Sequence, residues 1–278
     1  MTILVTGATG VVGRRVVAEL LQEGRAVRAL TRRPAAATLP GEVDVREGDL
    51  ERPESLQPAL KGVERLYLFP MPETAAEIVA MAVESGVRRI VVLSGASATE
   101  EEFGSGYLAV EQAVSRSGVD WTHVRPGEFA GNWLDWGPKI RAERVVRRPY
   151  GEAVTQPTHE SDVAAVAAAA LLRDGHTGRT YTFAGPQALT VREQVSAIAA
   201  AIGSPVRFEE QDPIPARDLW IQEGYPAEVV DWLFGMWRES AENPLPVNEQ
   251  WASVVPDITG RPARTFAEWA VENAAAFR

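Results

Sequence analysis

Three glycines near the N-terminus have the spacing of a phosphate-binding turn. In "VTGATGVVGRRVV", Gly7, Gly10 and Gly13 follow an apolar strand pattern and open a helical pattern. Glycines permit a tight turn and close approach of the backbone to a pyrophosphate, and the helix N-terminus then faces the negative charge. We therefore expect a dinucleotide cofactor here, with a glycine-rich turn that binds no ligand as the alternative. The other residues predicted to contact the cofactor at this turn are Thr9, Val11 and Val12.

The end of the second predicted strand indicates which dinucleotide binds. "LTRRP" (30–34) places Arg32 and Arg33 where, about 20 residues after the glycine turn, a carboxylate would bind the ribose 2′-hydroxyl of NAD. A guanidinium can instead bind a 2′-phosphate through two hydrogen bonds and stack on adenine. The pattern therefore predicts NADP or NADPH, and the alternative is a solvated basic loop.

The sequence "EGDL" (47–50) ends the third predicted strand. Asp49 can accept a hydrogen bond from the adenine amino group while Leu50 packs on the ring. The alternative is that Asp49 caps the helix that follows. Both roles are compatible.

The segment "GYLAVEQA" (106–113) holds a candidate for proton transfer. Tyr107 lies on a helix that follows the fifth predicted strand, and Ser94 stands at the tip of that strand. A phenol with a pKa near ~10 is a poor base at neutral pH without a nearby cation. The residue four positions later is Glu111, so we expect Tyr107 to act, at most, as a hydrogen-bond donor to substrate.

Each of these three residues also has a structural alternative. Tyr107 can be an aromatic packed between helix and cleft. Ser94, the second catalytic candidate, can instead bond to the backbone or to the cofactor ribose. Glu111 can be a helix-surface residue or can anchor its helix.

Further candidates follow the carboxyl ends of predicted strands, where parallel sheets bind ligands. The remaining predicted cofactor contacts are Phe69, Pro70, Met71, Ser94, Gly95, Pro126, Gly127, Glu128 and Phe129. A tryptophan-rich second half suits a large, flat, apolar substrate, although aromatic packing within a lobe is the alternative. The predicted substrate contacts are Tyr107, Asn132, Trp133, Trp220 and Trp232. No cluster of residues has metal-ligand spacing, so we expect no metal.

The elements that must position these residues alternate between strands and helices. Apolar strands separated by helical patterns predict an α/β fold, a Rossmann-like doubly wound parallel sheet with a smaller, mainly helical C-terminal lobe. The predicted strands are 2–6, 26–31, 43–49, 65–69, 89–94, 121–125 and 180–185, and the helices include 14–24, 54–61, 73–85, 106–117, 160–172 and 190–203. Thr190 and Glu193 form a capping-box pattern at the start of the last of these helices.

The same patterns predict how the chain is divided into domains. Residues 1–130 and 153–185 form the predicted NADP-binding domain. Residues 131–152 and 186–264 form a substrate lobe over the carboxyl ends of the sheet. Residues 265–278 form a C-terminal helix that packs on the body.

Composition excludes several classes of function. The 278 residues are 45% hydrophobic and 24% charged, which indicates a globular protein with a large core. A net charge of -10 argues against a nucleic-acid or anionic-membrane surface, and the absence of cysteine excludes disulfides and thiolate chemistry. "MTILVTGATG" lacks a basic signal-peptide region, and no run approaches the roughly 18 apolar residues of a membrane span. We therefore expect a cytoplasmic protein with a small-molecule partner, and a homodimer remains open.

The chain resembles an atypical short-chain dehydrogenase/reductase of the NmrA-like group, which includes NADPH-dependent quinone oxidoreductases and redox-sensing proteins. The resemblance covers nearly the whole length and implies strand order 3-2-1-4-5-6-7 and a substrate cleft between sheet and lobe. It rests on the glycine turn, "TRRP", "GDL", "VRPGEFAGNW" (124–133), "HESDVAAVAAAAL" (159–171) and "ITGRPARTFAEWAVENAAAF" (258–277). Standard short-chain dehydrogenases carry a lysine where Glu111 stands. Quinone-reducing relatives carry a histidine near the Tyr107 position and a lysine at that of Gln112.

These departures favour a substrate that is easily reduced. A reduced quinone or aromatic polycyclic ketone delocalises its oxyanion, so that water or one hydrogen-bond donor can protonate it and the enzyme mainly orients two planar partners. We therefore predict an NADPH-dependent reductase of such a substrate, suited to secondary metabolism, that works without a Tyr–Lys pair. The alternatives are a non-catalytic NADP(H)-sensing regulatory protein and a redox-neutral epimerase or dehydratase of the same fold.

Overall fold

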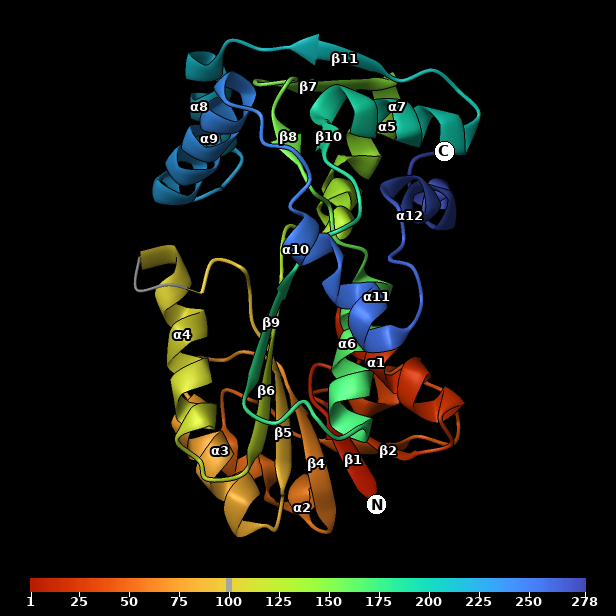
Figure 1. The fold of residues 1–278 in the computed structure, drawn as a ribbon. Helices are drawn as coiled ribbons and strands as arrows, with labels where there is room; N and C mark the ends of the chain where they lie inside the picture. Colours follow the sequence, from red (N-terminus) through yellow and green to blue (C-terminus); the bar gives the residue numbers. More distant parts are fainter. Residues whose placement is uncertain (99–101) are drawn as a thin grey trace. The chain divides into compact units, whose positions relative to one another are not determined.

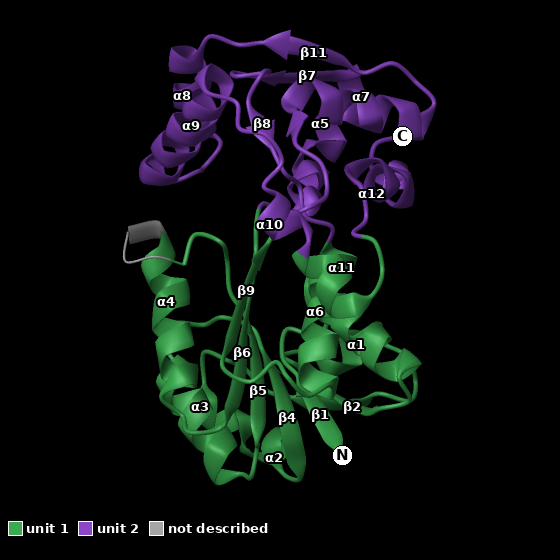
Figure 2. Cartoon of the chain, viewed as in Figure 1, with its two compact units in different colours: residues 1–127, 160–183, 254–262 green, residues 128–159, 184–253, 263–278 purple. Residues whose placement is uncertain are grey.

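The chain forms two compact units in the computed structural model, which describes residues 1–98 and 102–278 (Figures 1 and 2). Unit 1 comprises residues 1–127, 160–183 and 254–262, and unit 2 comprises residues 128–159, 184–253 and 263–278. The contacts thus group 153–159 with unit 2 and 254–262 with unit 1, whereas the sequence pattern grouped them the other way.

Unit 1 is built on a seven-stranded sheet in which all neighbouring strands are parallel. The strand order is β3-β2-β1-β4-β5-β6-β9. Because β9 is the seventh strand of this sheet along the chain, the predicted order 3-2-1-4-5-6-7 is confirmed. The strands are β1 (Thr2–Val5), β2 (Ala26–Thr31), β3 (Asp44–Glu47), β4 (Val63–Leu68), β5 (Arg89–Leu93), β6 (Asp120–Pro126) and β9 (Arg179–Phe183).

Helices cover both faces of this sheet, as Figure 1 shows. α1 (Val11–Gln22), α6 (Glu160–Leu172) and α11 (Val254–Thr259) cover one face, and α3 (Ala75–Glu84) and α4 (Glu102–Ser115) cover the other. Both faces of the central strands are therefore buried, which explains the continuous apolar runs in their sequences. The short elements of this unit are η1 (Pro34–Ala36), η2 (Pro53–Leu56) and α2 (Gln57–Leu60).

The alanine-rich run of α6 is a buried helix, and its bounds agree with the predicted helix 160–172. Its residues from Val163 to Leu171 are all buried. Alanine has no long side chain, so α6 packs closely against both α1 and the central strands.

Unit 2 is mainly helical, with two short ladders. β7 (Val145–Arg148) pairs in parallel with β11 (Arg207–Glu210), and β8 (Val154–Thr155) pairs antiparallel with β10 (Leu189–Thr190). The core is rich in aromatic residues, since Trp237, Trp269 and Phe277 are all buried in it. The helical elements are η3 (Ala130–Trp136), α5 (Gly137–Glu143), α7 (Val191–Ile202), α8 (Pro213–Gln222), α9 (Ala227–Glu242), α10 (Glu249–Ala252), α12 (Phe266–Glu272) and η4 (Ala274–Ala276).

Two helices of unit 2 begin with capping boxes. The predicted Thr190–Glu193 box is present at α7, and Thr265–Glu268 forms a second one at α12. Each box satisfies two backbone N–H groups that a helix start would otherwise leave open. Of the helices in the described part of the chain, none combines the length and apolar character that a membrane crossing needs.

Candidate cofactor and substrate sites

The glycine turn of unit 1 is a close-packed cradle. Gly7 has φ +58°, in the left-handed region that favours glycine, and its carbonyl oxygen accepts a hydrogen bond of 2.9 Å from the Gly10 N–H. A Cβ at Gly13 would stand 2.1 Å from that same carbonyl oxygen. The first turn of α1 therefore lies directly on the loop, with its N-terminus at Gly10, a residue with no side chain to cover it.

Neighbouring side chains hold this turn in place. Arg14 Nη2 donates to the Thr9 carbonyl oxygen at 2.6 Å, and Thr6 Oγ1 donates to the Tyr67 carbonyl oxygen at 3.0 Å. Thr6 Oγ1 also accepts from the Phe69 N–H at 2.7 Å. The carboxyl ends of β1 and β4 are thereby tied together beside the cradle.

A cavity of about 380 Å³ extends from the glycine turn to the carboxyl ends of β2 and β3. Glycine N–H groups at one end suit a pyrophosphate, and cationic side chains at the other suit a ribose phosphate, so the residues present fit a dinucleotide. Its lining includes Gly7, Thr9, Gly10, Arg32, Arg33, Asp49, Leu50, Phe69 and Met71, all predicted from the sequence, together with Leu30, Thr31, Gly48 and Glu51.

The two arginines at the end of β2 are open to solvent. Arg32 and Arg33 are both exposed, and in the described residues neither guanidinium has an ion-pair partner. The nearby Asp49 is engaged, because its carboxylate accepts from the Glu51 N–H at 3.2 Å and lies 3.6 Å from Arg52 Nε. Arg52, not Asp49, is the N-cap of η2, so the alternative role of Asp49 as a helix cap is wrong. Two uncompensated cations thus remain at the predicted 2′-phosphate position.

The Arg32→Glu variant tests this preference. We expect NADPH affinity to fall by about 10- to 100-fold, since a charge-assisted contact becomes a repulsion, while NADH affinity changes by less than about threefold. Fluorescence titration with each reduced cofactor measures both values. Arg46→Glu, on the outer strand β3, is the matched charge control. Equal losses for the two cofactors would remove the 2′-phosphate role from Arg32.

Glu111 anchors α4 to the sheet. Its carboxylate is 3% exposed and accepts hydrogen bonds from Arg125 Nε at 2.7 Å and Ser94 Oγ at 2.6 Å. Burial by itself would raise the pKa of Glu111, but the hydrogen bonds from Arg125 and Ser94, with the charges of Arg125 and His123, outweigh it and lower that pKa. The helix-anchoring alternative for Glu111 is therefore confirmed. The Ser94 hydroxyl proton is used in this same contact.

Tyr107 lies at the carboxyl end of β5. Its half-buried ring packs on the loop after that strand, where a Cβ at Gly95 would stand 3.1 Å from Tyr107 Cε2. The loop is fixed from the next strand, because the Ala96 N–H donates to the Pro126 carbonyl oxygen at 2.9 Å. The phenol is thus placed by two strand ends rather than by Glu111. In the structure as described, the cofactor cavity is not lined by the predicted contacts Val11, Val12, Gly13, Pro70, Ser94, Gly95, Pro126 and Gly127.

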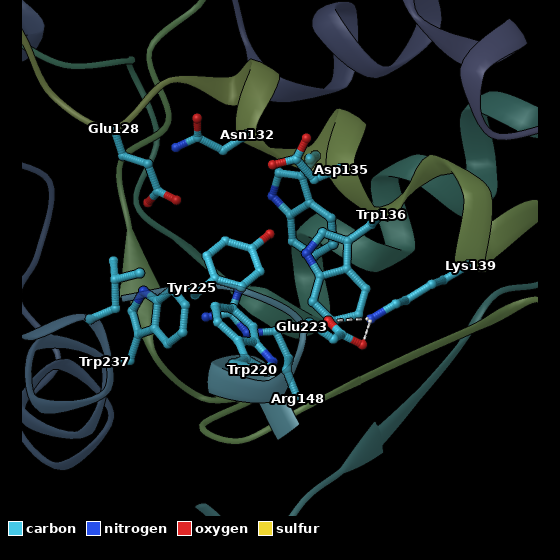
Figure 3. Close-up of a pocket in the computed structure, with 12 residues that line it drawn as sticks. Glu128, Asn132, Asp135, Trp136, Lys139, Arg148, Trp220, Glu223, Tyr225 and Trp237 are labelled. Atoms are coloured by element: carbon cyan, nitrogen blue, oxygen red, sulfur yellow. Dashed lines mark hydrogen bonds and ion pairs between the residues drawn. The ribbon is translucent and has the colours of Figure 1, made fainter. Parts of the chain in front are cut away.

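Unit 2 holds a second cavity, of about 190 Å³, walled by aromatic rings (Figure 3). Glu128, which the sequence suggested as a cofactor contact, lines this cavity, whereas Phe129 pairs with Thr158 in an isolated bridge. The predicted substrate residue Trp232, on α9, is 38% exposed and is not among the residues that line this cavity. The lining residues are Glu128, Asn132, Trp133, Asp135, Trp136, Lys139, Arg148, Trp220, Glu223, Tyr225, Leu233 and Trp237.

Trp133 and Trp220 differ in how they contribute to this cavity. Trp133 is 4% exposed, and its Nε1 donates to Gln194 Oε1 at 2.6 Å, so it is largely a core residue that also reaches the wall. Trp220 packs edge-on against Trp237 at 5.6 Å and is tilted against Tyr225 at 5.3 Å. These three rings form a ready surface for a flat ligand.

Arg148 is one of several lining residues of this cavity that sequence reasoning missed. It ends β7 in the same strand phase as the core residue Val146, and that phase is the signal that could have revealed a buried arginine. Its guanidinium lies 3.8 Å from the centre of the Trp237 ring. Burial lowers the pKa of Arg148 to about 10, against the opposing charges of Glu128 and Glu210.

Comparisons with known proteins agree on one family. Residues 7–174 match the family model described as NAD(P)H-binding. The chain is 42% identical over 287 residues to a (4-alkanoyl-5-oxo-2,5-dihydrofuran-3-yl)methyl phosphate reductase of Streptomyces griseus subsp. griseus, covering 99% of each chain. It is 35% identical over 289 residues to an NAD(P)H azoreductase of Xenophilus azovorans, again covering 99% of each.

A solved structure extends this agreement to three dimensions. The NADPH-dependent quinone oxidoreductase of Escherichia coli superposes with a TM-score of 0.79 at 25% identity, covering 98% of this chain and 99% of that one. The same oxidoreductase has been solved in complex with NADPH. In the described residues, no group of three or more histidine, aspartate or glutamate side chains could hold a metal ion. The chain therefore belongs to the NAD(P)H-binding family, as an NADPH-dependent oxidoreductase of the atypical, NmrA-like short-chain dehydrogenase/reductase type.

Proposed function

We propose that this enzyme transfers hydride from NADPH to a quinone, an aromatic polycyclic ketone or a similarly conjugated acceptor, in a reaction suited to secondary metabolism. One observation carries the proposal. The residue four positions after Tyr107 is Glu111, whose carboxylate is bound to Arg125 and Ser94. Tyr107 therefore has no lysine at that position to make it a strong base, and an easily reduced acceptor does not require one.

The chemistry places a modest demand on the protein. Bound NADPH would supply a hydride, which is a proton with two electrons, to the acceptor. The acceptor oxygen would then take a proton from water or from a donor such as the Tyr107 phenol. A delocalised oxyanion is a weak base, so protonation need not be concerted with hydride transfer. Binding the two planar partners in the right orientation can then supply most of the rate enhancement.

The relatives support an acceptor of this kind. Their names give a furanone phosphate, an azo compound and a quinone as acceptors, all of which contain a conjugated double bond that can accept hydride. The aromatic wall formed by Trp220, Tyr225 and Trp237 suits such a flat molecule.

A panel assay tests the proposal. The protein is first titrated with NADPH, and oxidation of the bound cofactor is then followed by absorbance with a series of quinones and aromatic ketones. We expect turnover with at least one of them and a rate that depends on acceptor concentration. Tight NADPH binding with no oxidation by any acceptor would contradict the proposal and favour the NADP(H)-sensing alternative. Substrate conversion without net NADPH consumption would favour the epimerase or dehydratase alternative.

The Tyr107→Phe variant tests how much the phenol contributes. General acid catalysis typically supplies about 100- to 10,000-fold, so a phenol that only assists should leave kcat within about tenfold of the wild-type value. Tyr181→Phe, on β9, is the matched control for loss of a tyrosine hydroxyl. Steady-state kinetics with the best quinone measures both variants. A loss of more than about 100-fold in Tyr107→Phe alone would make the phenol an essential acid.

A further inference from the structure

The guanidinium of Arg148 is buried with one edge unused. The residue is 6% exposed, and its Nε and Nη2 atoms have no hydrogen-bond partner among the described residues. A buried cation with two nitrogen atoms that make no hydrogen bond is costly, so such an edge calls for a partner. Arg148 lines the aromatic cavity of unit 2, and the Trp237 ring covers one flat side of the guanidinium.

Two other arginines of this chain show what that edge binds. Arg125 uses Nε and Nη2 to hold both oxygens of Glu111, and Arg217 uses the same two atoms to hold Asp231, with Nε···Oδ1 and Nη2···Oδ2 distances of 2.5 and 2.9 Å. The Nε–H group and one Nη2–H group lie on the same side of the guanidinium and form a fork. This fork matches the two oxygens of a carboxylate or phosphate. Arg148 also lines the cavity, and its Nε and Nη2, both buried, hold no carboxylate in the described residues.

The carboxylates around Arg148 do not occupy its fork. Glu210 is held by Arg192 Nη2 at 2.7 Å and by the Gly151 N–H at 3.1 Å. Glu128 shares the cavity lining, and its Oε2 also lacks a partner in the part of the chain that is described. Burial raises the pKa of Glu128, against the opposing effects of Arg148, Thr155 and Asn132.

We infer that Arg148 is an oxyanion-binding residue and that the acceptor reduced by this enzyme carries a carboxylate or a phosphate ester. The inference rests on the proposed function in one respect, namely that the aromatic cavity of unit 2 receives the acceptor. Trp220, Tyr225 and Trp237 then contact the flat body, while the Arg148 fork binds the charged end. Figure 3 shows Glu128, Arg148 and these aromatic side chains around the cavity.

Three probes of similar shape test the inference by binding, without turnover. The full-length protein is titrated with 1-naphthyl phosphate, 1-naphthoate and neutral 1-naphthalenemethanol, with tryptophan fluorescence as the readout. We expect at least one anion to bind roughly 10- to 100-fold more tightly than the neutral probe, the range for one charge-assisted pair of hydrogen bonds. Which anion binds more tightly distinguishes a phosphate ester from a carboxylate. Equal affinity of all three probes, or no anion binding at all, would overturn the inference.

Variants of Arg148 make the test specific. Arg148→Met should remove the preference for the anion and leave binding of the neutral probe within about threefold, whereas Arg148→Lys should keep part of that preference. Arg217→Met, an exposed arginine of the same unit, is the control and should change neither affinity. A preference that survives in a folded Arg148→Met would overturn the assignment. A different result would separate the two proposals: anion binding depends on Arg148, but none of the tested acceptors supports NADPH oxidation. That result would refute the proposed function and leave the oxyanion site in place.

Discussion

Replacing Gly13 with alanine is expected to weaken NADPH binding by more than about 100-fold and to lower the free energy of unfolding by about 3 kcal/mol. The added methyl group would stand 2.1 Å from the Gly7 carbonyl oxygen, 2.7 Å from the Gly7 carbonyl carbon and 3.0 Å from Ala8 Cα. All three are backbone atoms, so no side chain can rotate away to relieve the clash. Either α1 moves off the turn or the turn opens, and both changes displace the N–H groups that face the pyrophosphate.

A second glycine inside a helix provides the control. Gly235 lies in α9, and a Cβ built on it has nothing within 4 Å. Gly235→Ala should therefore leave NADPH binding unchanged and, because alanine is the better helix former, raise stability by up to about 1 kcal/mol. Urea unfolding and NADPH titration of both variants give the comparison. If Gly13→Ala behaves like Gly235→Ala, close packing of the helix on the turn is not what this glycine provides.

The fold was predictable because its signals are local. Apolar strands bounded by turns, each followed by a helical period, identify the parallel sheet, and the glycine turn identifies its first strand. The cofactor cavity follows from these signals, because the carboxyl ends of β1, β2, β3 and β4 must meet at one edge of the sheet. The residues predicted at those strand ends, such as Arg32 and Phe69, accordingly lie in one cavity.

The substrate side was less predictable because its contacts join distant parts of the chain. Arg148, Glu128 and Trp237 come from β7, a loop and α9, and no sequence spacing brings them together. The tryptophan-rich second half predicted substrate contacts or packing within the lobe, but it did not separate Trp220, which lines the cavity, from Trp232, which lies outside it. Whether a tryptophan lines the cavity depends on which face of its helix it occupies. The sequence of α9 has apolar residues on more than one face, so it does not show which face lies toward the cavity.

Glu111 illustrates the same limit within the sheet. The sequence shows a carboxylate where a lysine was expected, but its partners lie on two other elements, Ser94 just after β5 and Arg125 in β6. Only the folded chain shows that Glu111 is a structural anion. This assignment has a measurable consequence for stability.

Removing Arg125 should leave the buried Glu111 carboxylate without its guanidinium partner, although the Ser94 hydroxyl and the His123 ring, 3.5 Å from Glu111 Oε2, remain beside it. We expect Arg125→Met to lower the free energy of unfolding by about 3 kcal/mol near neutral pH, the usual cost of breaking a largely buried pair. Arg217→Met is the matched control, because Arg217 holds Asp231 through the same two nitrogens but at the exposed surface, where loss of a pair changes stability little. The double variant Glu111→Gln/Arg125→Met, which also removes the carboxylate charge, should recover a large part of the loss.

The dependence of this loss on pH separates charge from packing. In the folded wild-type protein the pKa of Glu111 is lowered, so the stabilisation from its ionised form is present above the unfolded value of about 4.3 and is lost as pH falls through the lower folded value. In Arg125→Met, burial is opposed by the Ser94 hydrogen bond and the His123 charge but no longer by the guanidinium, so the pKa of Glu111 should be higher than in the wild-type protein. Acid then protonates Glu111 in the variant first, and the deficit relative to wild type should shrink between about pH 7.5 and about pH 5. Urea unfolding of the variant and the wild-type protein at both pH values measures this deficit. A deficit that stays constant would mean that Arg125 contributes through packing of its side chain rather than through its charge.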